Sequence, residues 1–231
     1  MLGGREGRHA STVRRLDVGE RVDVTDGAGT VAECSVVASA PGRVSLAVLT
    51  RRTEPPPQPR VVVLQAILKG DRGELAVELL TEIGADVIVP WSAERCVAVW
   101  RGDRADRSRV RWNTTAQEAA KQSRRAWFPE VTAPADLGAA VRRVAAAALA
   151  VLLDPDATTS VASLAVPTAG EVVLVVGPEG GVTTAEAEAL RAAGAVPAAL
   201  GPTVLRGSTA GVVAASVLLS QTGRWQGRRT D

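Results

Sequence analysis

The sequence of 231 residues contains few of the residues from which metal sites and disulfide frameworks are built. It has a single His and two Cys, and the cysteines, Cys34 and Cys96, lie far apart in the chain. Two separated thiols and one imidazole supply neither a disulfide framework nor a convincing set of metal ligands. His9 stands alone near the N-terminus, so a Ser-His-Asp hydrolase is not supported either. We expect a protein without a metal.

Aromatic residues and long apolar runs are also scarce. Aromatic side chains make up 3% of the sequence, with no Tyr and one Phe, although hydrophobic residues make up 46%. The interior must therefore be filled by Val, Leu and Ala, which suits helices packed on a parallel sheet. No apolar run approaches the roughly 20 residues of a membrane span, and the first residues lack the apolar segment of a signal peptide. We expect a cytoplasmic protein that does not enter a membrane.

Two glycine-containing loops stand out in the C-terminal part of the chain. The apolar run 174–176 ends in the turn 177–181, Gly-Pro-Glu-Gly-Gly, and a capping box of Thr183 and Glu186 then opens a helix. A second short strand leads into the loop 200–210 and then into a helix over 211–222 that is apolar on nearly every face. Two strand–loop–helix units in tandem make a ligand site at the C-terminal ends of parallel strands. Neither loop has the G-x-G-x-x-G or G-x-x-x-x-G-K-[ST] spacing, which argues against a dinucleotide site or a P-loop.

The net charge of +2 conceals a segregated pattern. Residues 95–125 contain nine Lys and Arg against three acidic residues, and residues 206–231 contain four against one. Residues 61–94 and 126–205 carry net negative charges of −4 and −5. A polyanion-binding face requires such a concentration of basic residues, so we expect residues 95–125 to form one.

The remaining patterns predict two domains of different fold class. Apolar positions alternate within residues 9–52, which predicts a small β domain with a hairpin at Asp26-Gly27. The prolines at 55–59 predict a stiff linker. Strands then alternate with helices, which indicates a parallel sheet; the strands are expected at 61–68, 87–90 and 149–154, and helices at 71–84 and 108–125.

The helix at 71–84 can be specified further. We expect Asp71 with Glu74 to cap its first turn and Gly84 to end it. One apolar stripe should face the sheet; it consists of Leu75, Leu79, Leu80 and Ile83.

Together these motifs resemble a known family. GPEGG at 177–181 followed by LGPTVLRGSTA at 200–210 is similar to the SPOUT class of methyltransferases, and within it to the RsmE family of 16S ribosomal RNA (uracil-N3)-methyltransferases. Further matches at 69–72, 82–85, 92–96 and 120–125 extend the resemblance over nearly the whole chain. Two departures stand out, because the family most often reads LGPRILRTETA. This chain has Thr203 for the first Arg and Gly207-Ser208 for Thr-Glu.

The resemblance implies an α/β fold, with a SPOUT-type parallel sheet and a C-terminal trefoil knot preceded by a small PUA-like β-barrel domain. We assign residues 1–54 to the PUA-like RNA-binding domain, 55–59 to the linker and 60–231 to the methyltransferase domain. Chains of this family usually begin with a further strand, for which Met1 lies too close to Gly7. Either the start is misassigned or the barrel is open at one edge, which would leave an unpaired strand.

The resemblance also implies S-adenosylmethionine as methyl donor and N3 of one uridine in small-subunit ribosomal RNA as acceptor. We expect the enzyme to meet this RNA within the assembled small subunit. N3 lies on the Watson–Crick edge, so the uracil must be unpaired or flipped, and its anion needs a cation nearby. Arg206 is the candidate for that cation, and Glu179 for a base or for a group that orients a backbone amide. Because Ser208 replaces the usual Glu, the general base is left open. The residues expected to bind the donor are Leu153, Gly177, Pro178, Glu179, Gly180, Gly181, Leu200, Gly201, Leu205, Arg206, Ser208 and Thr209.

RNA contacts are implied in both domains. The N-terminal domain contains a stretch that matches the basic recognition segment of the family, and the methyltransferase domain contributes the end of the helix at 108–125. The residues expected to bind RNA are His9, Arg14, Arg15, Lys69, Arg95, Lys121, Gln122, Arg124 and Arg125.

The C-terminal helix predicts a homodimer. A helix that is apolar all round must be covered on every side, and a second copy across a two-fold axis is the simplest cover; the N-terminal domain folding back is the alternative. Two other functions stay open: methylation of a ribose 2′-OH in transfer or ribosomal RNA, and a non-catalytic RNA-binding factor in ribosome assembly.

Overall fold

A computed structural model of the chain describes residues 1–226. Arg228 and Arg229, which contribute to the basic charge predicted for 206–231, lie outside the described residues, as do the last five positions of the range 60–231. The chain divides into two compact units, Met1–Pro56 and Pro57–Asp231.

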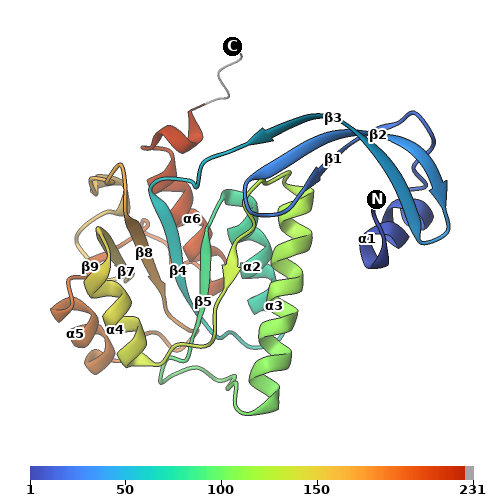
Figure 1. Ribbon diagram of the computed structural model, residues 1–231. Coiled ribbons are helices and arrows are strands. Elements are labelled where there is room, and N and C mark those ends of the chain that lie inside the picture. The colour runs from blue at the N-terminus through green and yellow to red at the C-terminus, as the bar shows by residue number, and fades with distance from the viewer. Residues whose placement is uncertain (227–231) are drawn as a thin grey trace. The chain divides into compact units, whose positions relative to one another are not determined.

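The first unit is built on an antiparallel sheet of order β1-β2-β3 (Figure 1). Its elements are α1 (Gly4–Arg8), the short helical turn η1 (His9–Val13), β1 (Arg21–Thr25), β2 (Thr30–Ala40) and β3 (Arg43–Thr53). The predicted hairpin at Asp26-Gly27 is confirmed, because β1 pairs with β2 around this turn. The Asp26 carboxylate accepts hydrogen bonds from the amides of Ala28 (2.7 Å) and Thr30 (3.0 Å).

The start of this unit differs from the strand pattern expected for 9–52, since residues 9–13 are helical. Gly7 lies close to the turn between β2 and β3, because an added Cβ would lie 2.5 Å from the carbonyl oxygen of Gly42. Only glycine permits this close approach. Beyond β3 the described residues supply no fourth strand; Leu2 alone pairs with Val44, through two backbone hydrogen bonds of 2.8 and 3.0 Å.

The second unit is a parallel sheet of order β6-β5-β4-β8-β7-β9, with helices on both faces. The strands are β4 (Arg60–Ala66), β5 (Val87–Trp91), β6 (Glu130–Val131), β7 (Leu149–Leu153), β8 (Glu171–Val176) and β9 (Val196–Ala198). The helices are α2 (Arg72–Ile83), α3 (Asp103–Gln122), α4 (Leu137–Ala146), α5 (Thr184–Ala192) and α6 (Gly207–Leu219), with short turns η2 (Val161–Ser163) and η3 (Gly223–Trp225). This architecture confirms the predicted α/β class.

Alternate residues of β4 define the two layers of the core. Val61 and Val63 pack with buried residues of α2, α3 and α6, whereas Val62 and Leu64 pack with those of α4 and α5. A strand buried on both faces reads as a continuous apolar run, as the sequence does here. None of the described helices has the length and apolarity needed to cross a bilayer.

Four local predictions need correction, and the first is the helix expected at 108–125, which is α3 and begins at Asp103. The Asp71 side chain makes no capping hydrogen bond, although α2 does begin there and end at Gly84 with φ 103°. The predicted stripe of α2 is wrong in part: Leu75 is 44% exposed, and Ala76 and Val77 are buried with Leu80 instead. Small residues on this face let α2 pack closely, a feature that hydrophobic periodicity does not reveal. The C-terminal helix α6 begins at Gly207 rather than at residue 211. The trefoil knot stays a prediction.

Candidate active site

The first glycine loop leaves β8 at the C-terminal edge of the sheet. Gly181 adopts φ 73°, a conformation that favours glycine, and its amide donates to the Pro178 carbonyl at 2.9 Å. The loop ends in the predicted capping box, which is confirmed: the Thr183 amide donates to Glu186 Oε2 at 2.9 Å, and the Glu186 amide donates to Thr183 Oγ1 at 3.3 Å. The hydrogen bond within the loop and the capping box after it thus hold residues 178–186 in one conformation.

The second glycine loop follows β9 and runs into α6. Gly201 adopts φ 144°, and Arg206 is the N-cap residue of α6. An added Cβ at Gly207 would lie 3.0 Å from Leu68 Cδ2 and 3.1 Å from the Gly177 carbonyl oxygen. The glycine at this departure from the family pattern therefore lets the start of α6 approach the first loop closely.

A cavity of about 630 Å³ lies between these loops and the C-terminal ends of β4, β7, β8 and β9. Ten of the twelve predicted donor residues line it: Leu153, Gly177, Pro178, Glu179, Gly180, Gly181, Leu200, Gly201, Leu205 and Arg206. Ser208 and Thr209 do not, because α6 begins early and turns them away; Ser208 is buried, and Thr209 Oγ1 donates to the Arg206 carbonyl at 3.2 Å.

Two acidic residues of the cavity wall are absent from the residues expected to bind the donor, although the strand expected at 149–154 ends at the first of them. Asp154 and Asp156 follow β7 and line the cavity together with Pro155. Asp154 Oδ1 accepts from the amide of Asp156 at 3.0 Å, and Oδ2 accepts from Arg191 at 3.3 Å. The signal was available, since polar residues directly after a parallel strand border the ligand crevice in this fold class.

Arg95 also lines the cavity, although it was predicted only as an RNA contact. Its Nη1 donates to the Gly180 carbonyl at 3.0 Å. The loop that carries it is held by Glu186, which is 4% exposed and whose Oε1 accepts from the Glu94 amide at 2.7 Å. Glu186 therefore both caps α5 and positions Arg95 against the first glycine loop.

Cys96, on the same loop, is not a candidate nucleophile. Burial raises the pKa of its thiol above the ordinary value of 9.0, and the nearby Glu186 and Glu179 carboxylates raise it further. The thiol consequently stays protonated at neutral pH, whereas a nucleophilic cysteine requires the thiolate. Within residues 1–226, no cluster of His, Cys, Asp and Glu is placed to hold a metal ion.

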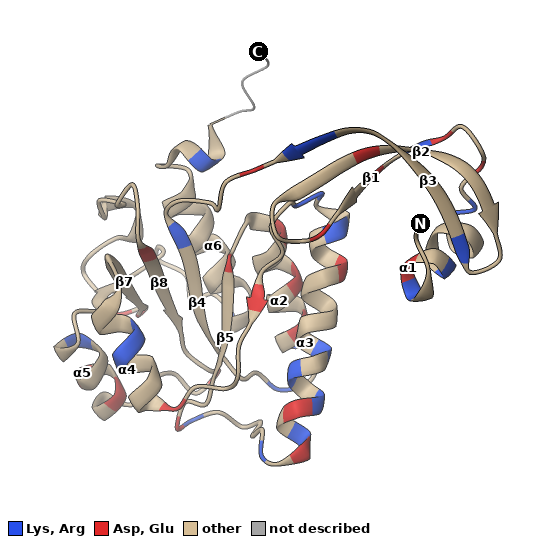
Figure 2. Ribbon diagram, in the orientation of Figure 1, with Lys and Arg blue, Asp and Glu red and all other residues tan. Residues whose placement is uncertain are grey.

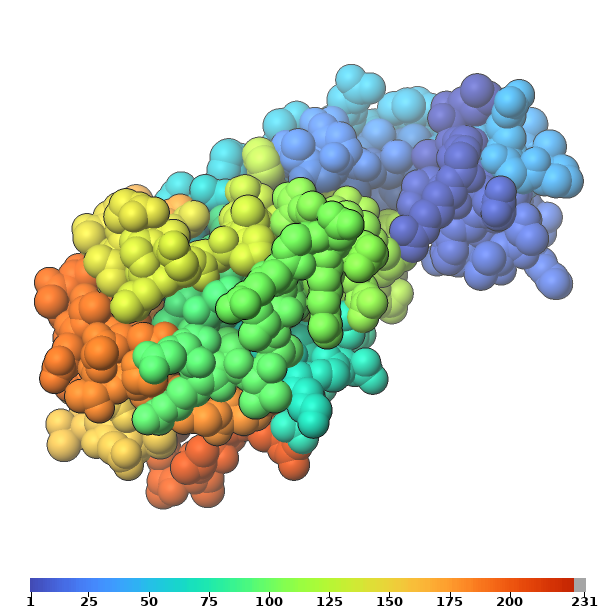
Figure 3. Space-filling view, turned by 90° about the horizontal axis from the view of Figure 1, so that it is seen from below, coloured from blue at the N-terminus to red at the C-terminus, as the bar shows by residue number. Residues whose placement is uncertain are grey.

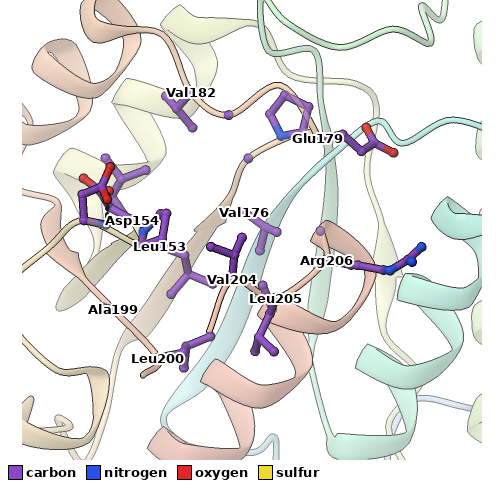
Figure 4. Close-up of a pocket in the computed structure, with 18 of the residues that line it drawn as sticks. Leu153, Asp154, Val176, Glu179, Val182, Ala199, Leu200, Val204, Leu205 and Arg206 are labelled. Atoms are coloured by element: carbon purple, nitrogen blue, oxygen red, sulfur yellow. Dashed lines mark hydrogen bonds between the residues drawn. The ribbon is translucent and has the colours of Figure 1, made fainter. Parts of the chain in front are cut away.

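The two predicted catalytic side chains lie on one side of the cavity. Figure 4 shows Glu179 and Arg206 projecting away from Asp154, which lies on the opposite side with Leu153. Arg72 Nη1 lies 3.8 Å from Glu179 Oε1, so Glu179 already has a cationic neighbour. The cavity thus has an apolar and acidic side, and a second side with charged groups of both signs.

Comparisons with known proteins agree with this geometry. The model of the RNA methyltransferase domain matches residues 54–219, and that of the RNA methyltransferase PUA domain matches residues 2–49. The chain is 44% identical to ribosomal RNA small subunit methyltransferase E of Mycobacterium tuberculosis, over 100% of this chain and 90% of that protein. The chain belongs to the RsmE family.

Two further proteins support the match. The Bacillus subtilis protein of the same name is 30% identical, over 95% of this chain and 89% of that protein. A putative methyltransferase from Legionella pneumophila, solved in complex with its cofactor SAM, has a TM-score of 0.85 at 27% identity, over 94% of this chain and 89% of that one. The fold is therefore that of a SPOUT-type methyltransferase with an N-terminal PUA-like domain.

The residues predicted to bind RNA are mostly exposed in this RsmE-family chain. In the first unit they are His9, Arg14 and Arg15, and in the second Lys69, Arg95, Gln122 and Arg124, while Lys121 is half-buried and pairs with Glu118 at 2.9 Å. Figure 2 shows Lys and Arg concentrated along α3. The acidic residues of its first turn, Asp103 and Asp106, interrupt this pattern.

Arg125 is the exception, and its assignment to the RNA-binding face is wrong. Its side chain is 11% exposed and pairs with Asp86 at 3.4 Å, and Nη1 donates to the carbonyls of Thr81 and Ala85. Burial lowers the pKa of Arg125 to about 10, against the opposing effect of Asp86, so it remains charged at neutral pH. Arg224 binds the same carboxylate at 2.7 Å. Arg125 is therefore part of a buried ionic cluster.

Proposed function

We propose that the chain methylates N3 of a uridine in small-subunit ribosomal RNA, with S-adenosylmethionine as the methyl donor. The observation that carries the proposal is the cavity between the two glycine loops, which contains ten of the twelve residues that the family pattern assigns to the donor. The relatives named ribosomal RNA small subunit methyltransferase E support the substrate class. The complex of the Legionella neighbour with SAM supports the cofactor.

The residues of the cavity fit this donor. The side chains of Leu153, Leu200 and Leu205 provide an apolar surface for a flat adenine ring, and the backbone of both loops can read its edge. The carboxylates of Asp154 and Asp156 can accept hydrogen bonds from ribose hydroxyls. When bound, S-adenosylmethionine supplies an electrophilic methyl group on a sulfonium. The fixed loops align it for in-line transfer, and alignment accounts for much of the rate.

The target uracil would occupy the side of the cavity where Glu179 and Arg206 project (Figure 4). Arg206 would stabilise the negative charge that develops when N3 loses its proton. Glu179 would accept that proton or orient a backbone amide. Its ion pair with Arg72, at 3.8 Å and on a half-exposed surface, is weak enough to be exchanged when RNA binds.

The enzyme would act as a homodimer through α6. This helix is not covered on every side within one chain: Val213 is 37% exposed, and Val212 and Val217 are half-buried. Val204 of the second glycine loop is 80% exposed and Leu75 of α2, which packs on α6, is 44% exposed. We infer that a second copy covers these exposed apolar side chains. Gly207 and Ala210 of α6 line the cavity, so a dimer interface on α6 would also stabilise the donor site.

The test is methylation of unmodified small subunits, followed by digestion to nucleosides and mass spectrometry. We expect 3-methyluridine, formed only in the presence of S-adenosylmethionine and of this protein, which would act in the cytoplasm where these particles are found. A 2′-O-methylated nucleoside would identify a ribose methyltransferase instead. RNA binding without any methylated product would identify an assembly factor.

A further inference from the structure

A second, smaller cavity lies beside the donor cavity and has no assigned role. Its volume is about 150 Å³, and Leu68, which lines the donor cavity, lines this one too. Its wall is formed by the turn between β4 and α2 and by the start of α3, including Asp71, Trp100, Arg104 and Trp112. Figure 3 shows residues near 70 and near 100 side by side on this end of the second unit.

Two tryptophans meet in this recess, in a chain with few aromatic residues. Their ring centroids are 4.9 Å apart and their planes are inclined by 77°. Trp112 is 3% exposed, and its Cζ2 lies 2.9 Å from the position of a Cβ on Gly73, so glycine is required there. Trp112 is thus a buried part of the wall, while Trp100, which also lines the recess, is half-buried.

The polar groups of the recess suit a neutral ring better than a phosphate. Four charged residues line it, two of each sign, so the recess carries no net charge. Arg111 and Glu74 pair with each other at 3.3 Å. In contrast, no hydrogen bond or ion pair engages the side chains of Asp71 and Arg104 within residues 1–226. One acceptor and one donor are therefore free to bind the edge of a ligand.

From these observations we propose that the recess binds one nucleobase of the RNA, next to the uridine that enters the donor cavity. Proteins read single-stranded RNA by stacking splayed bases on aromatic side chains and by hydrogen bonds to the base edges. Trp100 would stack on the base, and Asp71 and Arg104 would read its edge. A cavity of this size holds one planar base but not a whole nucleotide. The recess would thereby select a flanking nucleotide and fix the register of the target uridine.

This inference rests on the proposed function, and the experiment separates the two. RNA affinity and methylation rate are measured for Trp100→Ala and Arg104→Ala, with an unmodified RNA fragment that carries the target uridine. Trp225→Ala, an exposed tryptophan elsewhere, and Arg142→Ala, on α4 across the sheet, serve as matched controls. We expect Trp100→Ala to weaken RNA binding by about ten-fold to a hundred-fold, the usual effect of losing one stacked base. The donor affinity of Trp100→Ala should equal that of the unmodified protein. Both control variants should keep the RNA affinity and the methylation rate of the unmodified protein.

A second arm identifies the base directly. Each nucleotide beside the target uridine is replaced in turn by an abasic residue. At one position the abasic replacement should weaken RNA binding to the unmodified protein. The same replacement should not weaken RNA binding to Trp100→Ala any further, because both changes remove the same interaction. If Trp100→Ala does not fold, Arg104→Ala and Asp71→Asn carry the same comparison. Normal methylation with full RNA affinity in these variants would overturn the recess alone, whereas failure of the unmodified protein to methylate unmodified small subunits would overturn the proposed function.

Discussion

At the scale of single residues, the proposed chemistry depends on a few side chains set at the edge of a backbone-lined cavity. Gly180 lets the first loop lie against Arg95, and Gly207 lets α6 approach Gly177. The charged groups are sparse, with Arg206 and Glu179 on one side of the cavity and Asp154 on the other. Under the proposed function, acceptor activation falls to Arg206 and Glu179, which also line the donor cavity, so donor affinity and the methylation rate have to be measured separately for each variant.

Replacement of Arg206 by Ala should impair the chemical step. Loss of one group that stabilises developing negative charge typically lowers kcat by about a hundred-fold. Because Arg206 projects away from Asp154 and Leu153, where the donor is proposed to bind, we expect the affinity for S-adenosylmethionine to change little. Single-turnover methylation with saturating donor measures the effect, and Arg206→Lys should restore part of the rate. An unchanged single-turnover rate in Arg206→Ala would assign the residue to loop structure instead.

The buried cluster around Asp86 should govern stability rather than activity. Arg224 donates to both Asp86 oxygens and to the carbonyls of Pro59 and Gly84, at 2.7 to 3.2 Å. Removing one partner of a buried ion pair costs about 3–5 kcal/mol, so we expect Arg224→Ala to lower the free energy of unfolding by an amount of this order. Denaturant titration measures it. The exposed Arg142→Ala should stay within about 0.5 kcal/mol, and equal stabilities of the two variants would contradict the account.

At the scale of elements, the sequence predicted the strands well because their apolar runs are long and their loops contain clear turn residues. The hairpin at Asp26-Gly27, β4, β5, β7, β8 and the Thr183 capping box were all placed correctly. The errors occur where tertiary packing overrides local pattern. Leu75 is exposed because α2 packs through its small residues, and Arg125 is buried because Asp86, distant in sequence, binds it. Neither fact is visible in periodicity or composition.

For the candidate donor site too, the sequence predicts what depends on local motifs and not what depends on tertiary packing. Ten donor residues were found from the loop motifs, since glycine turns at the ends of strands are local signals. Asp154 and Asp156 directly follow the strand expected at 149–154, but which side chains of that turn line the cavity depends on β7 lying beside β8. The recess at Trp100 was missed, because it requires two segments to meet that the sequence separates.

The basic face of α3 should bind RNA phosphates. Arg124 is exposed directly after this helix, so we expect Arg124→Glu to weaken RNA binding without affecting the fold. Each lost phosphate contact lowers the slope of log affinity against log salt by about 1. Binding titrations at several salt concentrations test this expectation, with Arg142→Glu as the control. If Arg124→Glu and Arg142→Glu had the same RNA affinity and the same salt dependence, the basic face of α3 would not contact RNA.

At the scale of the whole molecule, the exposed apolar face of α6 predicts a dimer. Val213→Asp should separate the subunits, because Val213 is 37% exposed in one chain and its replacement costs little within that chain. Donor affinity should fall too, since α6 also lines the cavity. Light scattering reports the mass, and calorimetry reports the donor affinity. A monomeric unmodified protein at micromolar concentration would refute the dimer.

The central claim is that the cavity between the two glycine loops is the donor site. Its most direct test is calorimetric titration of S-adenosylmethionine into the unmodified protein, Gly180→Val and Gly138→Val. A Cβ at Gly180 would lie 3.2 Å from Arg95 Cβ, so the branched side chain must displace the cavity wall, whereas Gly138 on α4 has only ordinary contacts at 3.5 Å. We predict one donor per chain for the unmodified protein and for Gly138→Val, and no measurable binding for Gly180→Val. Absence of binding to the unmodified protein, or unchanged affinity in Gly180→Val, would contradict the account.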